Sequence, residues 1–243
     1  MKTGHNLLPI TLATAITMGL STAAFAGDLS NFSTITQTEF VALSKDLAAA
    51  TSTKAIEPAA PLGVTGFDLS GSATVTQTQA GSAWTKVTGD GVDQLVQTKL
   101  SVSKGLPWGV DVGAFTSKVA STNVTVSGFH VKYALIGGNT IAPAVALRGS
   151  HSRMGGVSQM GLSNTSYDVL ISKGFLGFTP YAGLGIVSSK ATVNGVSTLS
   201  NENFNQHKSF VGLSWNMLLL NLSAEYDRTG QASSYAVKAG LRF

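Results

Sequence analysis

The chain has 243 residues, of which only 12% are charged, 27 are glycine and none is cysteine. So low a charged fraction is unusual for a soluble globular domain. Without cysteine there is neither a disulfide framework nor a thiolate that could act as a nucleophile or metal ligand. The formal net charge of +4 is spread along the chain and forms no basic stripe, so nucleic acid is not an expected partner.

The first 26 residues have the pattern of a secretory signal peptide. Lys2 precedes an apolar run over residues 7–20, and an A-x-A motif follows at residues 24–26. The run is shorter than the roughly 20 apolar residues of a membrane-spanning helix and has Pro9 near its start. We therefore expect an exported protein that is cleaved after Ala26.

Residues 27–63 differ in composition from the rest of the chain and are expected to form a leader. Residues 36–39 form a capping box that opens a short helix, and apolar residues follow on one face at Phe40, Leu43 and Leu47. The polar cluster at residues 51–53 ends this helix. A stiff, proline-containing segment at residues 57–61 then links the helix to the next domain.

From residue 64 to residue 243 apolar and polar residues alternate with period two, as in strands with lipid on one face and a polar lumen on the other. The last such segment runs from Tyr235 to a terminal Phe243. The expected fold class is all-β, a transmembrane antiparallel β-barrel of about ten strands, with eight or twelve as alternatives. The alternation is weakest around Gly128, Pro143 and Gly212.

The connections between the predicted strands are expected to alternate in length. Tight turns are predicted at residues 104–107, 137–139, 173–177 and 216–217, and longer polar loops at residues 79–91, 118–123, 149–164, 189–207 and 227–233. Short turns on the periplasmic side and longer loops outside are the asymmetry of bacterial membrane barrels.

Five aromatic residues fall near the ends of predicted strands, where a ring can lie at the boundary between acyl chains and headgroups. This predicted aromatic girdle comprises Trp108, Phe178, Trp215, Tyr235 and Phe243.

The signal peptide, the alternating strands and the final strand with Tyr235 and Phe243 resemble those of Gram-negative outer-membrane β-barrel proteins. Residues 103–109 and 172–183 are also similar to a set of uncharacterised, porin-like proteobacterial barrels with a helical leader. The resemblance implies an outer-membrane location in contact with lipid. It also implies that periplasmic chaperones and the barrel-assembly machinery are partners, with Tyr235 and Phe243 as the assembly signal. It implies no activity.

Titratable residues of both signs fall on the inward face of the predicted strands, where opposite charges should pair and narrow the lumen. Asp68 is expected to meet Arg242 where the barrel closes, and Glu225 to lie within diagonal reach of Lys238. The predicted lumen network comprises Asp68, Lys99, Asp111, Lys132, Arg148, Asp168, Glu225, Lys238 and Arg242, with His130 on the same face.

No pattern predicts a catalytic, metal or cofactor site. Omptin-like proteases resemble the expected barrel but depend on an aspartate pair and an Asp-His pair at the outer rim. Here Asp90, Asp93, His151 and His207 lie near predicted strand ends without an Asp-x-His motif. Palmitoyl-transferring barrels also have a leader helix, but their histidine lies in the first outer loop, and residues 79–91 contain none.

The expected function is a non-enzymatic structural or surface-interaction barrel with a narrow, charged lumen. One alternative is a pore for small solutes or ions that the leader helix plugs or gates. Another is an enzyme at the outer rim. The leader helix itself has three candidate positions: inside the lumen, on the surface of the inner leaflet, or against a periplasmic partner.

Overall fold

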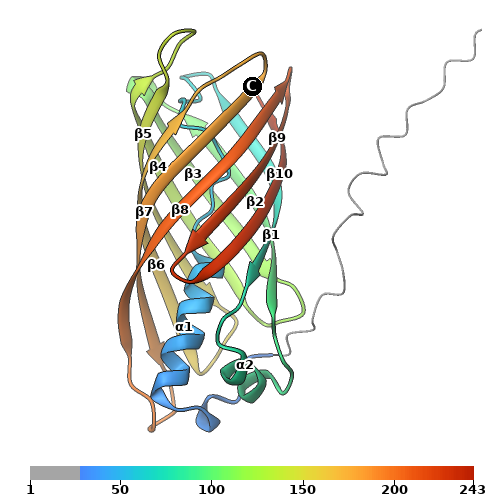
Figure 1. Ribbon diagram of the computed structural model, residues 1–243, viewed down its shortest axis with the longest axis vertical. Coiled ribbons are helices and arrows are strands. Elements are labelled where there is room, and N and C mark those ends of the chain that lie inside the picture. Colours follow the sequence, from blue (N-terminus) through green and yellow to red (C-terminus); the bar gives the residue numbers. More distant parts are fainter. Residues whose placement is uncertain (1–27) are drawn as a thin grey trace, which may run out of the picture.

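The computed structural model describes residues 28–243, so the predicted signal peptide lies outside the described residues. Ten antiparallel strands close into one barrel, in which consecutive strands are neighbours and β1 pairs with β10 (Figure 1). The predicted all-β fold, with ten strands rather than eight or twelve, is confirmed. The strands are β1 (Phe67–Gln77), β2 (Gln94–Gly105), β3 (Val110–Val119), β4 (Thr125–Gly137), β5 (Ala144–Gly155), β6 (Met160–Ser172), β7 (Phe178–Val193), β8 (Glu202–Met217), β9 (Leu220–Thr229) and β10 (Ala232–Arg242).

The two ends of the barrel differ. At what we call the turn end, β1 begins and β10 ends, and Phe67 and Phe243 exchange backbone hydrogen bonds. This end is at the top of Figure 1 and also carries residues 106–109 with the 3-10 turn η2 (Pro107–Gly109), 138–143, 173–177 and 218–219. The opposite loop end carries residues 78–93 with the helix α2 (Gly81–Thr88), 120–124, 156–159, 194–201 and 230–231.

Several predicted long loops are wrong, because strands occupy most of them. The predicted loops at residues 149–164, 189–207 and 227–233 shrink to residues 156–159, 194–201 and 230–231. In these strand extensions the outward residues are polar, for example Lys190 and Asn205, whereas inward residues such as Leu162 are apolar and join a buried core. The backbone pairing of β7 and β8 continues through the extensions, so the period-two alternation persists with its apolar face reversed.

An apolar band surrounds the turn-end half of the barrel on its outward face. On β8 the outward residues of the band are Val211, Leu213 and Trp215, each at least 38% exposed. Farther along the same strand, toward the loop end, the exposed residues Asn203, Asn205 and His207 are polar. A contiguous exposed apolar band on a barrel is the surface that lipid covers in membrane proteins. Among residues 28–243, no helix is both long and apolar enough to cross a bilayer.

The leader contains a 3-10 turn, η1 (Phe32–Thr34), and the predicted helix, α1 (Gln37–Thr51). The predicted capping box is confirmed: Thr36 Oγ1 accepts from the backbone N–H of Glu39 at 3.3 Å, and Glu39 Oε2 accepts from that of Thr36 at 2.9 Å. The helix ends at Ser52 in the predicted polar cluster. Its apolar face, with Phe40, Leu43 and Leu47, is fully buried.

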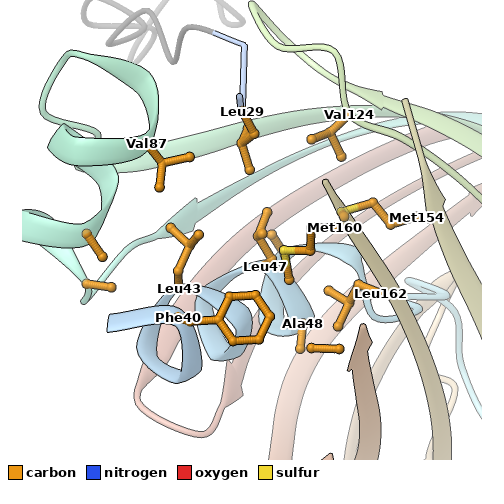
Figure 2. Packing of buried hydrophobic residues seen from close by; sticks show 14 of the residues in the cluster. Leu29, Phe40, Leu43, Leu47, Ala48, Val87, Val124, Met154, Met160 and Leu162 are labelled. Carbon is orange, nitrogen blue, oxygen red and sulfur yellow. The ribbon is translucent and has the colours of Figure 1, made fainter. Parts of the chain in front are cut away.

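This buried face belongs to an apolar core inside the loop end of the barrel (Figure 2). α1 packs there against Trp84 and Val87 of α2 and against inward residues of the wall such as Met160 and Leu162. The predicted loop at residues 79–91 contains α2, which the sequence analysis missed. Because α2 supplies the apolar partners of α1, the loop end is closed by the leader and the first connection together.

We predict that Leu43→Ala loosens the leader without opening the barrel wall. Removing this buried side chain should weaken the docking of α1 by about 2–5 kcal/mol, because it deletes apolar contacts and leaves a cavity. Hydrogen exchange in detergent micelles should then be faster for the amides of α1 and unchanged for those of the strands. Val64→Ala, at a position that is 61% exposed, is the control and should change neither. Unchanged exchange in α1 of the Leu43→Ala variant would contradict this role of the core.

Candidate functional site in the threaded lumen

The leader fills the lumen of the barrel. After α1, residues 52–66 run inside the wall from the loop-end half to the turn end, where β1 begins (Figure 1). Lys54, Ile56 and Glu57 are each at most 3% exposed in this segment. Of the three positions considered for the leader, the structure therefore shows the first, inside the lumen.

Lysine side chains of the wall hold the backbone of the leader. Inward lysines on three strands, β2, β4 and β8, donate hydrogen bonds to its carbonyl oxygens. The contacts are Lys132 Nζ to Pro58 O at 3.0 Å and to Ala60 O at 3.2 Å, Lys208 Nζ to Thr53 O at 2.8 Å, and Lys99 Nζ to Lys54 O. An ammonium group bonds a carbonyl more strongly than a neutral donor does. The non-helical backbone after α1 is thus fixed from several sides.

The only two charged side chains in residues 52–66 also pair with the wall. Lys54 Nζ lies 3.1 Å from Asp227 Oδ1, and Glu57 Oε1 lies 3.7 Å from both Lys132 Nζ and His130 Nε2. All five side chains are at most 5% exposed. Burying an isolated charge is costly, so the leader and the wall each need the other's charges.

Carboxylates of the wall complete the arrangement. Asp111 accepts the backbone N–H of Leu62 at 3.1 Å and pairs with Lys132 at 3.1 Å. On β5 and β6, Arg148 donates to Asp168 Oδ2 through Nε at 3.0 Å and Nη2 at 2.8 Å. Lys208 Nζ lies 3.5 Å from the same oxygen. Most residues of the predicted lumen network thus lie in one buried polar layer around the leader.

Two predicted pairs differ in the structure. Asp68 stands opposite Arg242 in the register of β1 and β10, but its ion partner is Lys238, at 2.9 Å. Arg242 is partly exposed at the turn end, whereas Lys238 is 5% exposed. Glu225 accepts a hydrogen bond from Tyr181 Oη at 3.0 Å and forms no ion pair with Lys238 within residues 28–243.

The buried lumen is balanced in charge. Besides His130 and Asp46 of α1, six basic and six acidic side chains are buried there: Lys54, Lys99, Lys132, Arg148, Lys208, Lys238, Glu57, Asp68, Asp111, Asp168, Glu225 and Asp227. A balanced layer in which most of the charges lie in ion pairs favours a sealed interior over a passage selective for one sign of charge.

Asp46 clamps the first connection onto α1. Its Oδ2 accepts from the backbone N–H of Gln79 at 2.8 Å, from that of Ala80 at 2.9 Å and from Trp84 Nε1 at 3.0 Å. Burial raises the pKa of Asp46 above its usual value of 3.8, although these hydrogen bonds oppose the shift.

The predicted girdle residues all lie on the outward side of the barrel. Trp108 is 89% exposed in η2, and Phe178 stacks on Trp215 with ring centroids 5.4 Å apart. Phe243 stacks on Phe67 at the same turn end. Tyr235 contacts Tyr226 across β9 and β10, near the other edge of the apolar band.

The rim residues considered for an enzyme lie apart. His151 and His207 are on the outward faces of β5 and β8, with β6 and β7 between them. Asp90 and Asp93 are exposed in the connection that contains α2. Within residues 28–243, no group of three or more histidine, aspartate and glutamate side chains is placed to hold a metal ion.

Several residues of this site were not predicted from the sequence. Asp227 falls in a segment predicted as a loop, and Lys208 directly follows another such segment. Lys54 and Glu57 lie in a segment with no periodic pattern. No sequence pattern singled out Tyr181, because its hydrogen-bond partner, Glu225, depends on how strands far apart in the sequence are aligned. A scan for single charges in the otherwise uncharged residues 52–66 would have singled out Lys54 and Glu57.

No family model matches this chain, and no curated protein matches it. Similar solved structures include a loop-deletion form of OmpT, an outer membrane protein of Vibrio cholerae, at 13% identity and a TM-score of 0.34; the match covers 62% of this chain and 54% of that one. Ail, the attachment invasion locus protein of Yersinia pestis, matches at 15% identity and a TM-score of 0.33, covering 73% of this chain and 99% of that one. The KdgM porin in complex with disordered oligogalacturonate matches at 10% identity and a TM-score of 0.39, covering 72% and 99%. The chain thus spans little more than half the length of the first of these proteins.

We predict that Lys132→Met destabilises the folded protein by about 3–5 kcal/mol, because it leaves Asp111 and Glu57 buried beside an apolar side chain. Unfolding in urea, followed by heat-modifiable migration, measures the change. Lys118→Met removes an exposed lysine on β3 and should change stability by less than about 0.5 kcal/mol. The triple variant with Asp111→Asn and Glu57→Gln should recover part of the loss, and no recovery would show that charge pairing is not the cause.

We predict that Asp46→Asn changes the dependence of stability on pH. A carboxyl whose pKa is raised by folding binds its proton more tightly in the folded state. Its contribution to the free energy of unfolding therefore increases as the pH falls through the raised pKa toward 3.8. Melting temperatures measured from pH 7 to pH 4 should rise for the wild type relative to the variant. A constant difference between the two would show that Asp46 does not titrate in this range.

Proposed function

We propose that this protein is an outer-membrane β-barrel that its own N-terminal leader seals, and that it acts without catalysis as a structural or surface-interaction protein. The observation that carries the proposal is the leader inside the lumen, fixed by ion pairs and by lysine bonds to its carbonyl oxygens. A sealed barrel has its accessible polar surface at its two ends. The larger of these ends is the loop end, with α1, α2 and the strand extensions.

The apolar band supports the membrane location. Its exposed valines, leucines and aromatic rings would be costly in water and match the hydrocarbon layer of a bilayer. Tyr235 on β10 and Phe243 directly after it are the residues that, by the resemblance, the barrel-assembly machinery and periplasmic chaperones would recognise. Cleavage after Ala26 remains part of the proposal.

The orientation follows from the two ends of the barrel. A barrel chain that arrives from the periplasm begins its first strand and ends its last strand there, so we propose that the turn end faces the periplasm. The polar strand extensions and the apolar core around α1 then project outward beyond the membrane. Because η1 and the start of α1 lie at the loop end, the leader reaches the cell surface.

A gated pore is the second candidate, and one observation favours it. Residues 52–62 contact the wall through ion pairs and hydrogen bonds, which water can replace if the segment moves, and through a small apolar cluster around Ala59. The contacts of the apolar core around α1 cannot be replaced by water, so this core holds the leader in place.

Conductance in a planar bilayer distinguishes the two candidates. We expect the wild type to be silent and a variant lacking residues 28–62 to open, because the deletion removes the segment that fills the lumen. Heat-modifiable migration must first show that the variant still folds. The double variant Lys54→Met, Glu57→Gln removes the leader's lumenal charges and should give brief openings. Steady openings of the wild type would contradict a sealed barrel and establish the pore.

Labelling of single cysteines on intact cells tests the orientation, since the chain has no cysteine of its own. Ser30→Cys, exposed near the loop end, should react with a membrane-impermeant maleimide added outside. Leu176→Cys, at a fully exposed position of the turn end, is the matched control and should react only after the outer membrane is permeabilised. The opposite pattern would reverse the proposed orientation.

A further inference from the structure

The barrel wall has a notch beside α1 at the loop end. β9 ends at Thr229 and β10 begins at Ala232, so this hairpin is shorter than its neighbours, as the red strands of Figure 1 show. The first six residues of β8, from Glu202 to His207, pair with β7 and have no strand partner on their other side. α1 lies in the gap. Gln37 ties it to the β7–β8 connection through Ser200 and Glu202.

A cavity of about 660 Å³ opens in this notch, between α1, the start of the first connection, β8 and the β9–β10 turn. Its size is within the range of small-molecule sites. Five side-chain amides are among its lining residues, and four of them form no hydrogen bond with other residues of the described chain: Gln79, Asn205, Gln206 and Gln231.

Among these residues, Gln206 is the strongest indication that the cavity binds a ligand. Its side chain is 7% exposed, and its Oε1 is buried without a hydrogen-bond partner among residues 28–243. The amide lies against Gly230, where an added Cβ would be 2.4 Å from Gln206 Nε2. Because Gly230 also has φ of +61°, glycine leaves room there that other residues would fill. A buried amide with an unused acceptor costs free energy unless something donates to it.

Two charged groups of α1 complete the lining. Lys45 is exposed at the cavity and forms no ion pair with the described residues. Asp46 receives its three hydrogen bonds on Oδ2, which leaves Oδ1 to accept from a ligand. The site therefore offers several planar amides, one carboxylate oxygen and one ammonium group.

We propose that this notch binds an oligosaccharide that carries an acidic group. Sugar hydroxyls both donate and accept hydrogen bonds, which suits amides and a carboxylate, and an ammonium group pairs with a carboxylate or phosphate on the sugar. The notch lies just beyond Tyr226 and Tyr235, at the edge of the apolar band. Two sources share this chemistry: the sugar portion of an outer-leaflet glycolipid and a free acidic polysaccharide.

Isothermal titration of the full-length protein in detergent micelles tests the site. The probes are a galacturonate tetramer, the phosphorylated core oligosaccharide released from an outer-leaflet glycolipid, and neutral maltotetraose. The wild type should bind an acidic probe at least about tenfold more tightly than maltotetraose. Lys45→Gln and Gln206→Leu should each weaken that binding by about tenfold. Lys118→Gln, an exposed lysine on β3, is the matched control and should leave it unchanged.

The tighter of the two acidic probes identifies the source, headgroup or free polysaccharide. Failure of both to bind would overturn the proposal, as would equal binding by the wild type and by folded Lys45→Gln and Gln206→Leu variants. The titration does not depend on the orientation of the protein in a membrane or on its conductance. A negative result here is therefore distinguishable from failure of the proposed function.

Discussion

The structure depends on the need to satisfy polar groups that the barrel wall excludes from water. The inward face carries long basic side chains, and buried ammonium groups need acceptors. The leader supplies them as backbone carbonyl oxygens. Residues 52–62 are not helical, so their carbonyls are free to accept, and Pro58 and Pro61 bring no N–H that would need a partner of its own. Lys132 uses this excess of acceptors by bonding two carbonyls on either side of Ala59.

The same constraint explains why α1 ends where it does. A helix with side chains is about 10 Å across and satisfies its own carbonyls, so it suits the apolar loop end, where few polar partners are offered. At Thr51 the wall begins to present polar groups: Ser152 Oγ donates to the carbonyl of Thr51 at 2.9 Å, and Asn164 Nδ2 donates to its hydroxyl at 2.9 Å. From this point the backbone is not helical, and its carbonyl oxygens accept hydrogen bonds from the wall. The leader therefore changes from helix to extended chain where the inner face of the barrel wall changes from apolar to polar.

Local sequence patterns predicted the parts of the fold that local physics controls. The capping box fixed the start of α1, and the period-two faces gave the ten strands. The same patterns failed for the strand extensions, because there outward residues such as Asn205 are polar and inward residues such as Phe204 are apolar, and for α2, whose apolar face depends on α1. Local sequence patterns also could not identify which charged side chains pair with one another. The register places Arg242 opposite Asp68, but which lysine or arginine reaches a buried carboxylate depends on depth and on the path of the leader.

The leader closes the lumen with two parts that differ in their physical properties, an apolar core around α1 and the polar segment that follows it. Their order along the leader decides which part can be released first. The apolar core around Phe40 and Leu43 releases only by exposing hydrocarbon to water, and salt does not weaken it. The polar segment with Lys54 and Glu57 can exchange its partners for water one contact at a time, yet it is buried too deeply for dissolved ions to screen it. A force or ligand acting at the turn end would therefore free the polar segment first and leave α1 anchored. Access to the lumen from the loop end requires the core to open, which couples such an opening to events at α1, at α2 and at the notch between α1 and β8.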